Sequence, residues 1–395
     1  MLRFLSLLTR KLQSHKHSKR EIKNFQKWKA EQNLPSYFCN TKKLLIIRLD
    51  DIGDYLLFRN MLCFYKRGRW KDYEITLLGN IAWKSFFDEL DYSNVDKVVW
   101  VNKKQFLKSE IYRAEVCLRI RKEGFEVVVC PSRTRPLLLD DICMLATGAT
   151  KKIASKNTFI NKNWNKLSDN LYNELYKSDE KCEHEFIFNL KFNNWICDTN
   201  ITLFRPEINT DNYKIDSNPY ILCFIGASTR SKRWTKKQWK QFVKLYQQNY
   251  KGDVYIAGGQ EDVVTADAIS AKTSAKSIAG ATTLEDMIRY VCNATCVITN
   301  DTMSAHLAVS CNVPAIIIAN GNNYFRFAAY ESAGINNVFS VYPARFTKQL
   351  TKKRGNLSDH FTAVTADINS ISAEEVFSKY VQLIDNNLNH KKSST

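Results

Sequence analysis

One stretch of the sequence, residues 299–321 with the apolar run just before it, constrains the fold more than any other. An apolar run ending at Ile298 predicts a buried strand, a short helix follows, and residues 315–319 predict a second buried strand. Between the first strand and the helix stand three residues of types that cap helices: Asn300, Asp301 and Thr302. A helix that begins just beyond a strand directs free N–H groups into the crevice above the sheet. The stretch therefore predicts a phosphate site, although an ordinary capped βαβ unit explains it equally well.

The same order of strand, loop and helix recurs in two series along the chain. Strands are expected at 43–49, 74–78, 97–101, 125–130, 220–225 and 253–257. Helices are expected at 55–65, 81–90, 109–123, 137–147, 168–176, 183–193, 236–249, 283–292 and 372–387. This alternation predicts an α/β fold with parallel sheets.

A polar segment rich in proline and asparagine near residues 204–219 separates the two series. With 395 residues, the chain is long enough for two domains of ordinary size. The predicted organisation has five parts: an arm at 1–42, a domain at 43–205, a linker at 206–218, a second domain at 219–371, and a helix and tail at 372–395.

The chain carries a formal net charge of +18, which favours anionic partners. Residues 1–43 hold eleven Lys or Arg against two Glu, and so contribute half of that excess. The apolar run at its start is too short to span a bilayer, and no small-residue cleavage site follows a long apolar core. The arm suits a basic amphipathic segment on an anionic membrane surface, and equally a solvated, partly disordered tail.

The 11 cysteines are scattered, odd in number, and form no Cys-x-x-Cys pair. Several stand inside apolar runs, as Cys130, Cys223 and Cys296 do. This pattern favours reduced thiols in a cytoplasmic protein over a disulfide framework or a metal site.

Polar residues follow several of the predicted strands, at the edge where α/β sheets bind ligands. Asp54 stands beside Gly53 at the start of the helix after the first strand, and Arg133 and Arg135 follow the strand that ends at Cys130. Arginine suits carboxylate and phosphate recognition, but solvated loop arginines are at least as common. In the second series, the loop 226–234 is rich in hydroxyl and basic side chains.

Five segments in order resemble the motifs of the bacterial heptosyltransferases, glycosyltransferase family nine. They are LLIIRLDDIGDYLL, GASTRSKRW, GGQEDVVTADAI, AGATTLEDM and NDTMSAHLAVSCNVPAIIIANG, spread over residues 43–320. The resemblance implies a GT-B fold with two Rossmann-like domains facing across a cleft, the first for the acceptor and the second for the nucleotide sugar. It also implies an inverting, metal-independent transfer at the cytoplasmic face of the inner membrane.

The resemblance assigns roles residue by residue. Asp54 falls on the proposed general base, and Arg133 and Arg135 remain candidates for the acceptor. The donor candidates are Ser228 with its neighbour Thr229, Lys232, Glu261, Asp301, Thr302, Met303 and His306. Lys232 and Ser228 fall on positions that contact the diphosphate, and Glu261 on one associated with the ribose. Met303 stands where the family usually has glycine, so the sequence departs from the pattern there.

These residues fit the chemistry of sugar transfer, which needs a base, fixed positive charge for the leaving diphosphate, and exclusion of water. The expected partners are a nucleotide-sugar donor, ADP-heptose, a lipid-linked saccharide acceptor of the lipopolysaccharide type, and an anionic membrane. No cofactor, metal or nucleic acid is expected. Two alternatives remain open: a non-catalytic sugar-binding relative, for which Met303 is the hint, and a nucleic-acid-binding protein, which the charge alone suggests.

Overall fold

The computed structural model describes residues 2–32, 34–35, 42–158, 161–178, 183–352 and 366–393, and of residues 2–15 and 386–393 only the backbone. The chain forms two compact units. The first unit comprises residues 1–51, 61–179 and 191–201, and the second comprises residues 52–60, 180–190 and 202–395. The segments 52–60 and 180–190 therefore group with the second unit, although the sequence places both within the first domain.

The first unit is built on a six-stranded sheet in which every neighbouring pair of strands is parallel, in the order β3-β2-β1-β4-β5-β6. The strands are β1 (Lys43–Arg48), β2 (Glu74–Asn80), β3 (Lys97–Val101), β4 (Val127–Cys130), β5 (Lys151–Ser155) and β6 (Glu174–Tyr176). The helices are α1 (Leu2–Glu31), α3 (Leu62–Tyr65), α4 (Lys84–Leu90), α5 (Lys103–Lys108), α6 (Glu110–Lys122), α7 (Ile142–Thr147) and α8 (Lys162–Asp169), with α9 (Glu185–Cys197) shared between the units.

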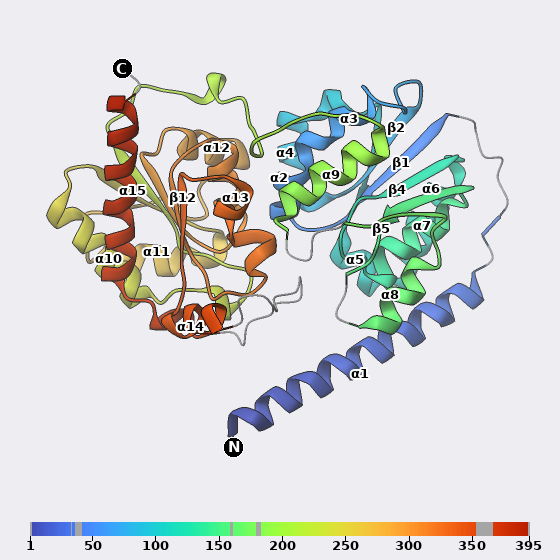
Figure 1. Ribbon diagram of the computed structural model, residues 1–395, viewed down its shortest axis with the longest axis horizontal. Helices are drawn as coiled ribbons and strands as arrows, with labels where there is room; N and C mark the ends of the chain where they lie inside the picture. The colour runs from blue at the N-terminus through green and yellow to red at the C-terminus, as the bar shows by residue number, and fades with distance from the viewer. Residues whose placement is uncertain are drawn as a thin grey trace. The chain divides into compact units, whose positions relative to one another are not determined.

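The second unit repeats this arrangement with the order β12-β11-β10-β7-β8-β9, again entirely parallel. The strands are β7 (Tyr220–Phe224), β8 (Asp253–Ala257), β9 (Lys276–Ser277), β10 (Cys296–Asn300), β11 (Ala315–Ile318) and β12 (Val338–Val341). The helices are α2 (Ile52–Phe58), α10 (Lys236–Asn249), α11 (Val263–Ser270), α12 (Leu284–Cys292), α13 (Met303–Ser310), α14 (Ala344–Lys352) and α15 (Ala373–Ser393). Helices cover both faces of this sheet, and in Figure 1 β12 lies between α15 and α13.

Both sheets have the strand order of a Rossmann fold, in which the order reverses once. The reversal lies between β1 and β4 in the first sheet and between β7 and β10 in the second. Loops at the carboxyl ends of these strands flank the crevice where such sheets bind ligands. The prediction of an α/β fold with two Rossmann-like halves is confirmed.

Helix α1 is the main departure from the predicted arm. Phe25 is fully buried in the core of the first unit, and Ile22 and Trp28 pack against that core. The second half of α1 therefore belongs to the first unit, and only the residues before it can act as a separate arm. Among the described residues, no helix is long and apolar enough to cross a membrane.

The polar segment after residue 150 was the least predictable part of the chain. A helix was expected at 168–176, but α8 ends at Asp169 and residues 174–176 form strand β6. This expectation was wrong because β6 is a three-residue edge strand and its neighbour β5 carries two lysines and a serine, so the apolar signal of a buried strand is weak here. The carboxyl side chain of Glu174 lies 3.7 Å from Lys151 Nζ, which links β6 to β5.

Candidate functional site

The loops after β7 and β10 meet at the carboxyl edge of the second sheet. Asn300, the last residue of β10, holds them together from a fully buried position. Its Nδ2 donates to the carbonyl oxygens of Ile225 at 2.8 Å and Gly226 at 3.2 Å, and its Oδ1 accepts from the backbone N–H of Trp234 at 3.2 Å. One buried amide thus fixes both ends of the basic loop predicted from the sequence.

Lys232 extends from this loop to the start of helix α13. Its Nζ lies 2.7 Å from Asp301 Oδ2 and also donates to the Asp301 carbonyl oxygen at 3.3 Å. Asp301 is 3% exposed and the Lys232 side chain 19%. The carboxylate therefore orients the ammonium group at the helix start while leaving part of it open to a ligand. Two predicted donor residues, far apart in sequence, are joined by this pair.

Helix α13 begins at Met303, with Thr302 as its extended N-cap residue. The Thr302 side chain caps no backbone N–H; its Oγ1 lies 2.7 Å from Ser304 Oγ instead. Ser304 Oγ also lies 2.6 Å from Thr299 Oγ1. Helix starts carry N–H groups without intrahelical partners together with the positive end of the dipole, which suits an anion.

His306 is a buried member of α13, one turn after its start. Its Nδ1 makes a short hydrogen bond with the Tyr330 hydroxyl, and the Tyr330 ring lies 4.6 Å from the ring of His184. Burial lowers the pKa of His306 to about 4, with the nearby Asp301 acting in the opposite direction. The imidazole is therefore neutral at neutral pH, so it acts as a hydrogen-bonding group rather than as a cation.

Helix α2, which carries Asp54, packs against α13 within the second unit. The closest approach is at Gly53, where an added Cβ would lie 2.9 Å from His306 Cδ2 and 3.6 Å from the Met303 Cα. Asp54 is half-buried in the first turn of α2. The predicted base is therefore next in sequence to the residue that contacts the predicted donor helix. Glycine at position 53, not at 303, provides this close approach.

Of the remaining donor candidates, Ser228, Thr229 and Glu261 are exposed. The side chain of Glu261 folds back toward Gly259, where an added Cβ would lie 2.6 Å from its Oε2. The sequence offered no reason to single out its neighbour Asp262, which is 4% exposed. Asp262 accepts from the backbone N–H of Gly259 at 3.0 Å and pairs with Arg233 at 3.3 Å. Asp262 therefore connects the loop after β8 to the loop after β7.

Sequence reasoning also missed a buried polar cluster at the start of α9, Glu183, His184 and Glu185. Glu185 is 1% exposed, and its Oε2 accepts from Arg326 Nε at 2.9 Å. His184 contacts Tyr330, the partner of His306. The run Glu-His-Glu before an apolar helix was the only signal available in the sequence.

The acceptor candidates Arg133 and Arg135 lie in the first unit and are 1% and 0% exposed. Arg135 Nη2 lies 2.6 Å from Asp169 Oδ1, its Nε lies 3.8 Å from Asp141, and its Nη1 donates to the Ser155 carbonyl oxygen. Arg135 is therefore an internal counterion, which corrects its prediction as an acceptor-binding loop residue. Arg133 is equally buried, so it presents no open guanidinium either.

Among the described residues, no group of three or more His, Cys, Asp or Glu side chains is arranged to hold a metal ion. A model of glycosyltransferase family 9 (heptosyltransferase) matches residues 192–350, which include the loops after β7, β8, β10 and β11. No protein with a curated description matches the chain.

Several solved structures share the fold at low sequence identity. A glycosyl transferase family 9 protein from Veillonella parvula has 16% identity and a TM-score of 0.66 over 90% of this chain and 100% of that one. The E. coli ADP-heptose lps heptosyltransferase II has 13% identity and a TM-score of 0.61 over 87% and 99%. E. coli heptosyltransferase WaaC with ADP-2-deoxy-2-fluoro heptose has 12% identity and a TM-score of 0.63 over 86% and 99%. These likenesses assign the GT-B fold.

Proposed function

We propose that this chain is a heptose-transferring enzyme, on the premise that its residues 192–350 match the model of glycosyltransferase family 9 (heptosyltransferase). The enzyme moves a heptose from ADP-heptose to a saccharide of the lipopolysaccharide type, with inversion at the anomeric carbon and without a metal ion. The E. coli WaaC structure with an ADP-2-deoxy-2-fluoro heptose supports an ADP-linked donor.

The proposed reaction divides between two groups of side chains. Asp54 accepts the proton of the acceptor hydroxyl as that oxygen attacks the anomeric carbon. Lys232 and the N–H groups at the start of α13 stabilise the charge that develops on the departing diphosphate. Because these groups supply fixed positive charge, the proposed transfer needs no divalent cation.

The observation that carries this proposal is the packing of α2 on α13. Gly53 lies against His306 and Met303, so Asp54 and the donor helix belong to one compact unit. This packing supports the proposal that the proton acceptor and the phosphate site lie beside each other, as a single displacement requires.

The direct test is transfer of sugar from ADP-, GDP- and UDP-linked donors to a lipopolysaccharide core fragment, read by mass spectrometry. ADP-heptose should be consumed fastest, and a chelator of divalent cations should leave the rate unchanged. No transfer from any donor would favour the non-catalytic alternative, and loss of activity with the chelator would contradict metal independence.

We also propose that α1 attaches the enzyme to an anionic membrane surface. Six basic side chains in its described half are exposed: Lys16, Lys19, Arg20, Lys23, Lys27 and Lys29. Each basic residue near an anionic leaflet contributes about 1 kcal/mol. The membrane-bound acceptors of such enzymes would then lie within reach of the active site.

Attachment through α1 is tested by replacing Lys16, Lys19 and Lys23 with glutamine, since deleting all of α1 would remove the buried Phe25. Loss of three charges should weaken binding to phosphatidylglycerol vesicles by roughly 10²-fold, from about 1 kcal/mol per charge. Activity on a water-soluble acceptor should stay unchanged. Vesicle binding as strong as that of the unmodified chain, at the same salt, would contradict attachment through these charges of α1.

A further inference from the structure

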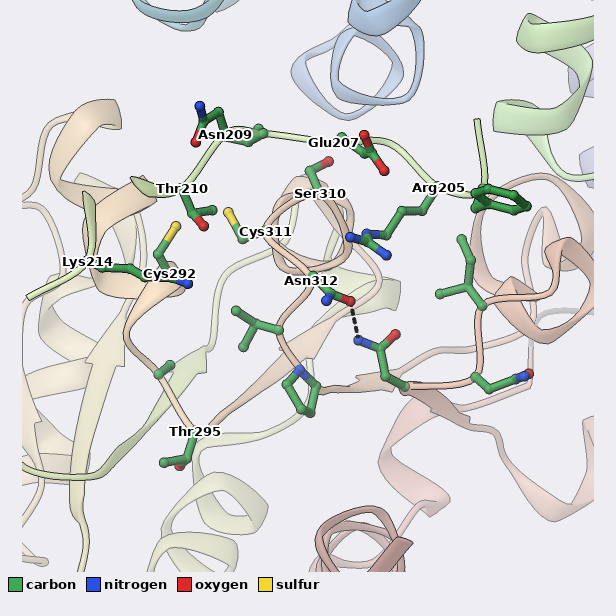
Figure 2. Close-up of a pocket in the computed structure, with 18 of the residues that line it drawn as sticks. Arg205, Glu207, Asn209, Thr210, Lys214, Cys292, Thr295, Ser310, Cys311 and Asn312 are labelled. Carbon is green, nitrogen blue, oxygen red and sulfur yellow. Dashed lines mark hydrogen bonds between the residues drawn. The ribbon is translucent and has the colours of Figure 1, made fainter. Parts of the chain in front are cut away.

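A cavity of about 1410 Å³ opens on the second unit, remote from the candidate donor residues. Figure 2 shows its walls: the linker segment 205–214 and the ends of α12 and α13. Thr295 and Pro314, which precede β10 and β11, also line it. The cavity therefore lies at the amino edge of the second sheet, whereas Asn300 and Lys232 mark the carboxyl edge.

Two cysteines meet on the wall of this cavity. Cys292 ends α12, Cys311 follows α13, and both line the cavity. In Figure 2 the two sulfur atoms lie on neighbouring parts of the wall. Cys292 is half-buried and Cys311 is buried, and both are in the free thiol form. Because both side chains belong to the same wall, the pair is a candidate for a disulfide, whose S–S bond length is about 2.05 Å.

Hydrogen bonds fix the backbone around this pair. Asn312 adopts the left-handed conformation that ends α13, with φ of 56°, and its N–H bonds the Val309 carbonyl oxygen at 3.0 Å. Asn293, just after Cys292, donates to the Tyr213 carbonyl oxygen at 2.8 Å and accepts from the Ile215 N–H at 2.9 Å. These two hydrogen bonds fix the backbone of Tyr213 and Ile215, the residues on either side of Lys214. Lys214 is therefore held close to Cys292.

The charges around the pair make the two thiols chemically different. The hydrogen bond from Cys311 and the Lys214 ammonium lower the pKa of Cys292, against the effect of its partial burial. The same hydrogen bond, together with burial, raises the pKa of Cys311 well above its usual value, although Arg59 opposes this. In contrast, burial raises the pKa of Cys117 to about 12. A thiolate stabilised by a lysine and open to a cavity is the arrangement of reactive cysteines.

We propose that Cys292 and Cys311 form a peroxide-sensitive dithiol, with Cys292 as the attacking thiolate and Cys311 as the resolving thiol. The Cys292 thiolate attacks one oxygen of hydrogen peroxide, the O–O bond breaks, and the released hydroxide takes a proton to become water. Cys311 then attacks the sulfenic sulfur, an S–S bond forms, and the second oxygen leaves as water with the Cys311 proton. Two thiols are oxidised and one peroxide is reduced to two waters.

This chemistry is separate from sugar transfer, because neither thiol takes part in the proposed transfer. The disulfide would join the carboxyl ends of α12 and α13 on the wall of the cavity. Transient disulfides of this kind are compatible with a reducing compartment.

The test begins with limiting iodoacetamide at neutral pH on the reduced full-length protein, with each cysteine quantified by mass spectrometry. Cys292 should react roughly tenfold faster than the half-buried Cys63, because only the thiolate is nucleophilic. Lys214→Gln should slow the alkylation of Cys292 by roughly twofold to fivefold, as expected for the loss of one partly screened charge. Equal rates at Cys292 and Cys63 would overturn the assignment of the nucleophile.

The second step adds one equivalent of hydrogen peroxide and maps disulfides without reduction. The expected product links the peptides of Cys292 and Cys311 and has lost two hydrogen atoms. Cys311→Ser should stop at a sulfenic acid on Cys292 that dimedone traps, whereas Cys63→Ser should leave disulfide formation unchanged. A dominant disulfide elsewhere, or no sulfenic acid in Cys311→Ser, would overturn the proposal.

Discussion

The two sheets of this protein share a strand order, yet they use the polar residues at their switch points in opposite ways. After β4 of the first sheet, Arg135 is fully buried between Asp169 and Asp141. After β7 of the second sheet, Lys232 pairs with one carboxylate, Asp301, and stays partly exposed. The loops that flank the two switch points thus hold a structural cation in the first unit and an accessible one in the second.

The difference shows that topology alone does not identify a binding site. A loop cation becomes structural when the surrounding chain supplies enough carboxylates to neutralise it, and removing one partner of such a buried pair costs about 3–5 kcal/mol of stability. A cation with one partner and open surface can still bind an anion. In addition, α2, the helix that follows β1, is not part of the first unit. Residues 52–60 group with the second unit instead.

The largest effect is expected from Asp54→Asn, which tests whether α2 serves the site of the second unit. Turnover should fall by roughly 10²–10⁴-fold, the range for loss of a general base, while donor affinity and the melting temperature stay unchanged. The measurement is a steady-state rate with saturating donor. Turnover near that of the unmodified enzyme would mean that α2 has only a packing role.

Stability as a function of pH should separate the two units. His306 in the folded second unit has a pKa of about 4, against about 6.5 in an unfolded chain. The unfolded chain therefore binds the extra proton, and stability is lost as pH falls from about 6.5 to about 4, by about 3 kcal/mol at most. Asp141 in the first unit has the opposite sign, because burial raises its pKa to about 6, so its contribution is lost as pH rises.

The measurement is denaturant unfolding of His306→Asn and Asp141→Asn at about pH 7 and about pH 4.5, compared with the unmodified chain. The loss of unfolding free energy caused by His306→Asn should be smaller at about pH 4.5 than at about pH 7. The loss caused by Asp141→Asn should be larger at the lower pH. If both losses of unfolding free energy changed in the same direction with pH, the predicted opposite pH dependence of the two units would be contradicted.

A smaller effect is expected from Gly53→Ala, which tests the contact between α2 and α13. Alanine favours a helix by about 0.5–1 kcal/mol over glycine, but here its Cβ would lie 2.9 Å from His306 Cδ2. Turnover should fall roughly tenfold, less than the 10²-fold typical of a misplacement of about 1 Å. In a chain that already carries His306→Asn, Gly53→Ala should not lower turnover further. Additive losses of turnover would show that the contact between position 53 and His306 is not responsible.

Much of the fold follows from local sequence. Apolar runs identified β1, β2, β3, β4, β7, β8, β10 and β11, because strands covered on both faces are almost entirely hydrophobic. Three of the four strands that were missed, β6, β9 and β12, are edge strands, and the fourth, β5, is next to an edge; all four are short or polar. Edge strands carry a weaker signal because part of each strand faces solvent.

The candidate site was predictable only as a set of positions. Asp301 and Lys232 could be named from the sequence, but their ion pair spans 69 residues and no local pattern encodes it. Likewise, the counterions of Arg135 are Asp141 and Asp169 of α8, which lie outside its own loop. The loop sequence alone therefore suggested that Arg135 was free to bind an acceptor. Tyr330 could not be found at all, since its role depends on the tertiary contact with His306.

The central claim is that the second unit binds the donor diphosphate through Lys232 at the start of α13. Calorimetric titration of ADP into the unmodified chain, Lys232→Ala and Arg230→Ala tests it directly, because Arg230 is an exposed cation in the same turn. The account predicts that Lys232→Ala weakens ADP binding by roughly tenfold or more, the loss of a charge-assisted contact, while Arg230→Ala stays within about twofold. Unchanged affinity in Lys232→Ala, or an equal loss in both variants, would contradict it.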